Sequence, residues 1–292
     1  MKNSYVVGIG EALWDLLPEG RKIGGAPANF AYHMSQFGYD AIAASAVGKD
    51  PLGDEIRAAF TAMGLKFELP QVDYPTGTVK VTLDAQGIPQ YEICTDVAWD
   101  NIPFTESLRG IAASTRCICF GSLAQRSAVS RATIHRFLET MPQDALKVYD
   151  INLRQQFYSR KVVENSMKAC DILKINDEEI LTVAHLFGLE TTDMKEACLA
   201  LREQYALKMI ILTCGSFGSY VFYDKGISFL YTPHVKVADT VGAGDSFTAG
   251  FCASLLHGHS VPEAHARAVA VSAFVCSCHG AMPRLPEELT HL

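Results

Sequence analysis

Short apolar runs alternate with segments of helical periodicity along most of the chain. The runs predict strands, and the segments between them predict amphipathic helices. A repeated strand–helix–strand order favours right-handed crossovers and a mainly parallel sheet covered by helices on both faces. The predicted strands are Tyr5–Ile9, Ala41–Val47, Cys117–Phe120, Lys147–Ile151, Ile172–Ile175 and Met209–Leu212, and the predicted helices are Pro27–Phe37, Gly53–Met63, Ser130–Thr140, Glu178–Leu186 and Met194–Tyr205.

Two regions depart from this alternation. Residues 76–95 show period-two patterning around a turn at Ala85-Gln86-Gly87, with no helix between the arms. Such an insertion is typical of a lid or dimerisation flap, or of an edge hairpin without a role. Near the C-terminus, a second hairpin is predicted before two helices: its arms are Tyr220–Tyr223 and Ile227–Tyr231, and the helices are about Asp245–His257 and Pro262–His279.

The composition is that of a soluble globular protein, and it narrows the possible partners. The 292 residues carry a formal net charge of −7, the opposite sign to that expected of a general nucleic-acid binder. No apolar run approaches the length of a membrane span, and the N-terminus lacks the apolar stretch and cleavage site of a signal peptide. We therefore expect a cytoplasmic protein without membrane or nucleic-acid partners.

Nine cysteines are present, and no two of them are spaced as CxxC. Cys117 and Cys119 alternate within one predicted strand, so both point to the same face of it. We interpret the cysteines as small buried hydrophobes in a reducing compartment. A zinc site at Cys276, Cys278 and His279 is the alternative, although this spacing is poor for structural zinc.

Small, amide and charged residues follow the predicted strands. Ligands of open parallel sheets bind beyond the carboxyl ends of the strands, so these residues predict a binding site at that edge. They are Gly121-Ser122, Asn152 and Arg154, Asn176 and Glu179, and Cys214-Gly215.

The stretch DTVGAGDSFTAGF, residues 239–251, combines a glycine-rich turn with the start of a predicted helix. Uncapped N–H groups and the helix dipole at such a turn attract anions, above all phosphate. Asp245 would repel phosphate, so we interpret it either as a helix N-cap or as a general base facing a substrate hydroxyl.

Other phosphate-binding motifs match poorly. The chain has no Walker A sequence and no protein-kinase signature set. Gly8-x-Gly10 follows a strand, but Leu13 occupies the third glycine position of a dinucleotide fingerprint. A nicotinamide-dependent oxidoreductase is therefore a weak alternative.

Two distant motifs resemble the ribokinase-like carbohydrate kinases, the PfkB family. The first comprises GIGEALWD, Gly8–Asp15, and GGAPANFA, Gly24–Ala31, and the second is DTVGAGDSF, Asp239–Phe247. Within that family, GGAPANFA and the phrase AWDNI, Ala98–Ile102, look most like fructokinases. The resemblance implies a ribokinase-like three-layer α/β/α sandwich over residues 1–292, with a small discontinuous β lid at about 11–25 and 72–104.

The resemblance also implies ATP-dependent phosphorylation of a sugar hydroxyl. Asp245 would be the base, and the amides of Gly242, Ala243 and Gly244 would form an anion hole for the transferring phosphoryl group. Sugar hydroxyls would be held by Asp15, Gly24, Gly25 and Asn29. Apart from the resemblance, the position of Arg154 just beyond a strand suits a brace for phosphate oxygens.

Nucleotide and metal positions follow from the same resemblance. Asn176 and Glu179 match the motif that organises Mg²⁺ through water, and the nucleotide would lie along Thr213, Gly215 and Gly218. Asp239 and Val241, with Ala281 from the other side, would hold a possible K⁺.

The residue patterns alone leave several of these positions open. The alternative for Asp15 is a solvent-facing turn residue, although a carboxylate that can accept two hydroxyl hydrogens is the favoured interpretation. The alternatives are an exposed helix residue for Asn29 and a surface ion-pair partner for Arg154. Asn176 with Glu179 also reads as a helix capping box.

Fructose, phosphorylated at O6, is the expected substrate, and 2-keto-3-deoxygluconate, ribose or a nucleoside are alternatives. A phosphorylated sugar fits less well, because residues 76–95 carry a single cation, Lys80. An inactive sugar-responsive binding protein is the alternative of another class. A homodimer through the lid hairpin is plausible, since that sheet must cover one face.

Overall fold

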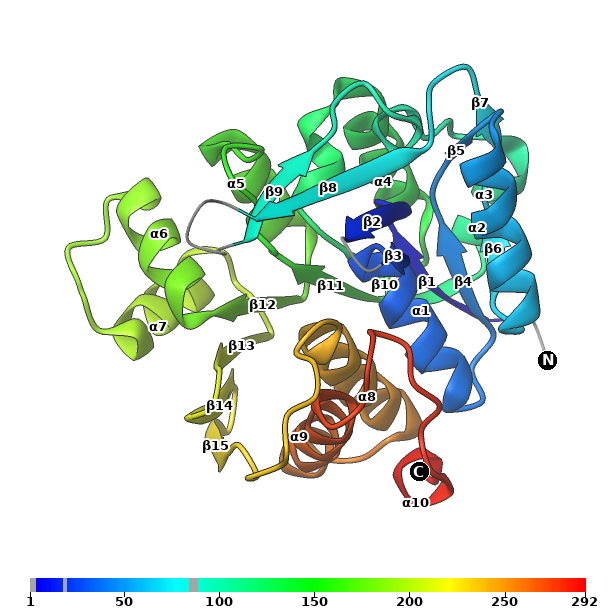
Figure 1. The fold of residues 1–292 in the computed structure, drawn as a ribbon. Helices are drawn as coiled ribbons and strands as arrows, with labels where there is room; N and C mark the ends of the chain where they lie inside the picture. The colour runs from blue at the N-terminus through cyan, green and yellow to red at the C-terminus, as the bar shows by residue number, and fades with distance from the viewer. Residues whose placement is uncertain (1–3, 18–19, 84–88) are drawn as a thin grey trace.

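A nine-stranded sheet forms the centre of the computed structural model, which describes residues 4–17, 20–83 and 89–292 (Figure 1). Neighbouring strands are parallel from β6 to β13, and β14 and β15 add an antiparallel hairpin. This mainly parallel α/β layout confirms the predicted fold class. In spatial order the strands are β15 (Gly226–Tyr231), β14 (Gly218–Tyr223), β13 (Met209–Cys214), β12 (Ile172–Asn176), β11 (Leu146–Asp150), β10 (Thr115–Phe120), β1 (Tyr5–Ile9), β4 (Ala41–Ala44) and β6 (Lys66–Glu68).

Helices cover both faces of this sheet, because its strands carry apolar side chains on both sides. On β10, Ile118 and Phe120 pack into one core, and Cys117 and Cys119 pack into the other, as their alternation predicts. The first core is covered by α3 (Glu106–Ala112), α4 (Ala128–Thr140), α5 (Arg160–Ala169), α6 (Asp177–Phe187) and α7 (Met194–Gln204), and the second by α1 (Ala26–Gln36), α2 (Pro51–Ala62), α8 (Ala243–His257) and α9 (Val261–Cys276).

A separate four-stranded sheet lies at one side of the large sheet. Its order is β3 (Gly20–Gly24), β2 (Leu13–Leu17), β8 (Gly77–Leu83) and β9 (Pro89–Ile93). The predicted hairpin in residues 76–95 corresponds to β8 and β9, while its proposed turn at Ala85-Gln86-Gly87 lies outside the described residues. We call this four-stranded sheet the lid.

Several elements differ from the sequence prediction. The strand expected at Ala41–Val47 divides into β4 and β5 (Val47–Gly48), since β5 leaves the large sheet to pair with β7 (Gln71–Val72). Helices α3 and α5 were not predicted, and a short α10 (Glu287–Thr290) follows α9. In the described ranges, no helix is both long and apolar enough to cross a membrane.

Candidate active site

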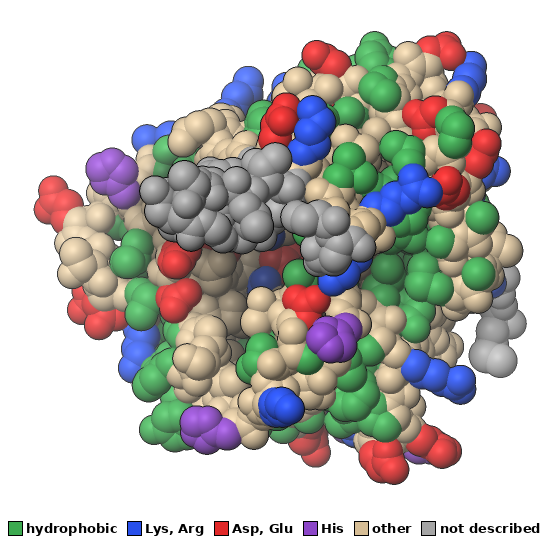
Figure 2. Space-filling view, in the orientation of Figure 1, with side chains coloured by type: hydrophobic (Ala, Val, Ile, Leu, Met, Phe, Trp, Pro, Cys, Tyr) green, Lys and Arg blue, Asp and Glu red, His purple; other side chains and the backbone are tan. Residues whose placement is uncertain are grey.

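A cleft of about 1900 Å³ lies between the carboxyl edge of the large sheet and the lid, and it forms the hollow across the middle of Figure 2. Most of the residues singled out in the sequence meet on its walls, although they come from distant parts of the chain. They are Asp15, Gly24, Gly25, Asn29, Arg154, Asn176, Thr213, Gly215, Gly218, Asp239, Val241, Gly242, Ala243, Gly244, Asp245 and Ala281. Glu179 does not line the cleft.

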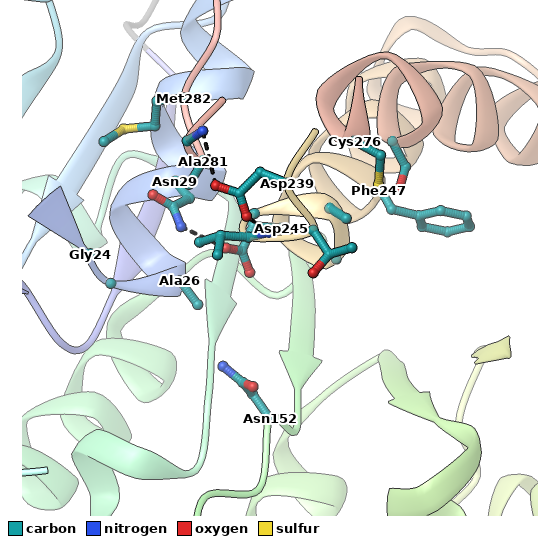
Figure 3. Close-up of a pocket in the computed structure, with 18 of the residues that line it drawn as sticks. Gly24, Ala26, Asn29, Asn152, Asp239, Asp245, Phe247, Cys276, Ala281 and Met282 are labelled. Carbon is teal, nitrogen blue, oxygen red and sulfur yellow. Dashed lines mark hydrogen bonds between the residues drawn. The ribbon is translucent and has the colours of Figure 1, made fainter. Parts of the chain in front are cut away.

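The start of α8 forms part of the cleft wall. Gly242 occupies the N-cap position with φ 77°, a left-handed conformation that favours glycine, and no side chain caps the helix. The N–H of Ala243 donates to the Thr240 carbonyl at 3.3 Å. Asp245 is the third helical residue, so the N-cap interpretation of Asp245 is wrong. Its carboxylate points into the cleft beside the first amides of the helix (Figure 3).

Asp245 is held by a side chain from α1. Asn29 Nδ2 donates to Asp245 Oδ2 at 2.7 Å, and Asn29 is buried, so it is not an exposed helix residue. Burial raises the pKa of Asp245 to about 7, with the nearby Asp150 carboxylate adding to the shift and Asn29 and Lys174 opposing it. A carboxylate with this pKa can accept a proton near neutral pH and release it again.

A buried ion pair lies behind the α8 turn. Lys174 Nζ donates to Asp150 Oδ1 at 3.0 Å, and Thr248 of α8 donates to the second Asp150 oxygen at 3.1 Å. A Cβ on Gly244 would lie 2.8 Å from Lys174 Nζ, so glycine at this position lets the ammonium approach the backbone. Burial lowers the pKa of Lys174, but Asp150, Glu179 and Asp245 outweigh it and raise that pKa overall. Lys174 therefore brings a positive charge to the glycine-rich turn before α8.

The start of α6 is capped within the chain. Asn176 Oδ1 accepts from the Glu179 N–H at 2.8 Å, and Glu179 Oε2 accepts from the Asn176 N–H at 3.0 Å. The other Glu179 oxygen accepts from the Leu153 N–H at 2.8 Å. This arrangement confirms the capping box predicted from the spacing. Both Glu179 oxygens bond backbone amides, while Asn176, Asp177 and Glu178 line the cleft.

The lid supplies Asp15 from β2, which is half-buried and lines the cleft. Burial raises the pKa of Asp15, and the cations Arg154 and Lys22 oppose that shift. A Cβ on Gly25, which has φ 122°, would overlap the Glu11 carbonyl, so glycine is required there, whereas a Cβ on Gly24 would displace the Asp15 carboxylate. Arg154 is exposed and makes no ion pair with the described residues.

Another part of the cleft wall comes from the end of β13, the start of β14 and helix α9. Thr213, Gly215 and Gly218 lie there with Val237 and Ala273, and Cys276 adds a half-buried thiol. No group of three His, Cys, Asp or Glu side chains within the described ranges is placed to hold a metal ion directly.

Asp239 links the segment that precedes α8 to the segment that follows α9. Its carboxylate accepts from the Val241 N–H at 3.1 Å and from the Gly280 N–H at 3.2 Å. Desolvation raises the pKa of Asp239, but these two bonds and Lys22 lower it overall. The Ala281 backbone lies against Gly242, where an added Cβ would be 2.7 Å from the Ala281 carbonyl oxygen.

Sequence reasoning missed three buried polar residues around the site: Lys174, Asp150 and Glu11. Glu11 is 6 % exposed, and its Oε2 has no hydrogen-bond partner among the described residues. Each of the three is a charged residue in or next to an apolar strand, and this was the signal available in the sequence.

Glycines 8 and 10 do not form a dinucleotide fingerprint. After β1 the chain enters the lid strands β2 and β3 instead of a helix, which is not the context that motif requires. A Cβ on Gly8 would overlap the Pro27 carbonyl, so this glycine allows α1 to pack closely on β1.

Residues 19–288 match the pfkB family of carbohydrate kinases. The chain belongs to this family. It is 27% identical over 271 residues to an ATP-dependent 6-phosphofructokinase from Thermoanaerobacterium thermosaccharolyticum, covering 90% of this chain and 82% of the relative. It is also 27% identical over 267 residues to a fructokinase from Salmonella typhimurium, covering 87% and 85%.

The fold is shared with a fructokinase from Vibrio cholerae that was solved with fructose, ADP and a calcium ion. The TM-score is 0.83 at 22% identity, covering 99% of this chain and 98% of that one. A double mutant of the same enzyme was solved with fructose, ADP and a potassium ion. The ribokinase-like fold and a carbohydrate kinase activity thus apply to this member of the pfkB family.

Proposed function

We propose that this carbohydrate kinase transfers the γ-phosphoryl group of ATP to O6 of fructose. The observation that supports this reaction most directly is the position of Asp245. It lies on the cleft wall, beside the amides at the start of α8 that no side chain of the described residues caps. A proton acceptor and a set of anion donors within one turn suit phosphoryl transfer to a hydroxyl, where catalysis is mostly positioning and electrostatics.

In the proposed mechanism, Asp245 takes the proton of the acceptor hydroxyl as the hydroxyl oxygen attacks the γ-phosphorus, and the bond from that phosphorus to the ADP oxygen breaks. The amides of Gly242 and Gly244 would face the charge that develops on the phosphoryl oxygens, joined by that of Ala243 when it exchanges its 3.3 Å bond to the Thr240 carbonyl for the phosphoryl group. The Lys174 ammonium lies behind Gly244 and adds a positive charge there. Because Gly244 has no side chain, nothing at that residue separates the charge from the phosphate. Closure of the lid over the sugar would exclude water and limit ATP hydrolysis.

We assign sugar binding to Asp15, Gly24, Gly25 and Asn29. Asn29 Oδ1 is buried and has no partner among the described residues, so it is free to accept a sugar hydroxyl. The Asp15 carboxylate can accept two hydroxyl hydrogens. Arg154, exposed at the same end of the cleft, would brace an anionic group.

We assign the nucleotide to the end of the cleft formed by Thr213, Gly215 and Gly218. Mg²⁺ keeps much of its water and binds carboxylates together with substrate phosphates. Asp177 and Glu178 fit such a hydrated ion, and Glu179 would act behind them by holding Asn176. Bound there, Mg²⁺ would neutralise phosphate charge.

Asp239, Val241 and Ala281 are the proposed neighbours of a monovalent cation. Backbone carbonyls and one carboxylate are suitable ligands for K⁺. The Asp239 carboxylate accepts two amides, and its lowered pKa keeps it charged.

An acidic sugar is the second candidate acceptor. Lys22 of β3 and Arg154 flank Asp15, so the sugar end of the cleft is more cationic than the lid hairpin alone suggested. A sugar acid such as 2-keto-3-deoxygluconate, or a sugar phosphate, would use these cations. Ribose and nucleosides would not.

ADP production with ATP and Mg²⁺ tests the proposal. Fructose, 2-keto-3-deoxygluconate, ribose and fructose 6-phosphate are compared in parallel, with and without potassium. We expect the highest kcat/KM with fructose and stimulation by potassium. A higher kcat/KM with an anionic sugar would replace fructose by the second candidate, and no sugar-dependent ADP with any acceptor would contradict both.

We also propose a homodimer through the lid, because β3 and β9 are the edges of a four-stranded sheet that the described residues do not extend. Sedimentation of the wild-type protein distinguishes a dimer from a monomer.

A further inference from the structure

We propose that His33 and Gln36 of α1 form a latch that holds Ala281 against Gly242 and thereby positions the phosphate-binding turn of α8. The inference concerns positioning residues, and its kinetic readout rests on the proposed function. Neither side chain lines the cleft, and neither belongs to the motifs that indicated the reaction.

The first contact of the latch is a hydrogen bond from helix to backbone. His33 is fully buried, and its Nε2 lies 2.9 Å from the Ala281 carbonyl oxygen. Gln36 Nε2 lies 3.3 Å from His33 Nδ1. Because the Gln36 amide nitrogen can only donate, Nδ1 must accept, so the proton is on Nε2 and His33 donates to Ala281. Burial lowers the pKa of His33 to about 4, which keeps the ring neutral as this arrangement requires.

Gln36 extends the same attachment along the chain. Its Nε2 also donates to the Pro283 carbonyl at 3.2 Å, and its Oε1 accepts from the Leu285 N–H at 2.7 Å. Three backbone groups of the segment 281–285 are therefore fixed to one turn of α1. A bond network with every member paired holds a segment in one arrangement.

The contact between Ala281 and Gly242 connects the latch to the active site. The Ala281 backbone and side chain lie where a Cβ on Gly242 would be, all at 2.7 Å from it, so the two residues are in close contact. Gly242 is the N-cap of α8 and supplies the first amide of the proposed anion hole. A shift of Ala281 would leave this turn without support on that side.

Asn29 and His33 are four residues apart and share a face of α1. Asn29 bonds the Asp245 carboxylate, and His33 bonds the residue that packs on Gly242. One helix face thus fixes both the base and the turn that precedes it. Figure 3 shows Asn29 on this helix with Ala281 and Met282 beside it and Asp245 facing it.

Three variants test the latch. His33→Leu removes the donor at similar volume, and His33→Gln replaces it with an amide that can still donate. Tyr39→Phe is the matched control, since the Tyr39 hydroxyl donates to the Ala253 carbonyl of α8 at 2.9 Å, far along the helix from the turn.

The first readout is amide hydrogen exchange of the unliganded proteins, which needs no substrate. We expect faster exchange in residues 239–246 and 279–285 of His33→Leu, and wild-type exchange there in the other two variants. Unchanged exchange in both segments of His33→Leu, or the same increase in Tyr39→Phe, would overturn the latch.

The second readout is steady-state kinetics with whichever sugar the wild type phosphorylates. We expect His33→Leu to lower kcat by at least about tenfold, with a change in sugar KM below about threefold, because only the turn is displaced. His33→Gln should retain kcat within about threefold. Equal loss in the Leu and Gln variants would contradict a donor role. A wild type without kinase activity would refute the proposed function and leave the exchange test intact.

Discussion

Two helices begin at the same edge of the large sheet, and their N-termini are built in opposite ways. At α6, Asn176 and Glu179 cap each other and satisfy amides inside the chain. At α8, glycine occupies the N-cap, no side chain caps the helix, and the first turn faces the cleft. A capped N-terminus stabilises its own helix, whereas an uncapped N-terminus in a cleft can bind an anion. The difference teaches that the missing side-chain cap, not the presence of a helix start, distinguishes the proposed phosphate site.

Adding a side chain at the N-cap of α8 should have the largest effect on catalysis. Gly242→Ala introduces a Cβ at φ 77° and at 2.7 Å from Ala281, so the turn must move. We expect kcat/KM to fall by at least about 10³-fold, as expected when anion-hole donors are displaced. Steady-state ADP production measures it.

The matched control is Gly188→Ala at the C-terminal end of α6. Gly188 also has a positive φ, 71°, but a Cβ there meets nothing within 4 Å. We expect a loss of about 1 kcal/mol in the free energy of unfolding and an unchanged kcat/KM. An equal fall of kcat/KM in both variants would mean that backbone strain alone explains the loss of activity.

The pKa of Asp245 predicts the next largest effect, which is a dependence of kcat/KM on pH. A general base works when deprotonated, and the pKa of Asp245 is about 7. The kcat/KM should therefore fall about tenfold per pH unit below this pKa and level off above it. A pH–rate profile from about pH 5 to about pH 9 measures it, and a flat acid side would show that Asp245 does not titrate in the reaction.

Removing the charge behind the α8 turn should shift that profile. Lys174 lowers the pKa of Asp245, so Lys174→Gln should raise it and move the acid limb to higher pH by about half a unit to one unit. The glutamine can still donate to Asp150, and thermal unfolding checks that the variant folds. A limb that stays in place or moves to lower pH would argue against coupling between Lys174 and the base.

Removing the N-cap side chain of α6 should have the smallest effect on catalysis. Asn176→Ala removes the bond to the Glu179 N–H and should lower the free energy of unfolding by about 1 kcal/mol. Because Asn176 lines the cleft, we also expect the KM for ATP with Mg²⁺ to rise, by about threefold. Urea unfolding and initial rates measure the two effects. A loss of kcat comparable to that of Gly242→Ala would erase the distinction between the two helix ends.

The sequence alone predicted the parts of the molecule that rest on local chemistry. Periodicity located most strands of the large sheet, and the glycines before Asp245 predicted a turn that leads into a helix. The sequence also predicted the capping box of Asn176 and Glu179, because both residues lie within one turn of helix. Short elements such as α3 and α5 were missed, since neither carries a long periodic pattern.

The support behind the site could not be predicted, because it depends on which distant segments meet. Lys174 and Asp150 are neighbours through the register of β11 against β12, and His33 meets Ala281 across 248 residues. No spacing in the sequence encodes these pairs. Asp245 was itself ambiguous, and only the structure shows that Gly242, three residues earlier, is the N-cap.

The most direct test of the proposed base is Asp245→Asn, which removes the proton acceptor while an amide can keep the contact with Asn29. Turnover is measured with saturating sugar and ATP, alongside calorimetric binding of the sugar. We expect sugar binding to persist and turnover to fall by at least about 10²-fold. Near-normal turnover in a folded, sugar-binding variant would contradict the assignment of Asp245 as the base.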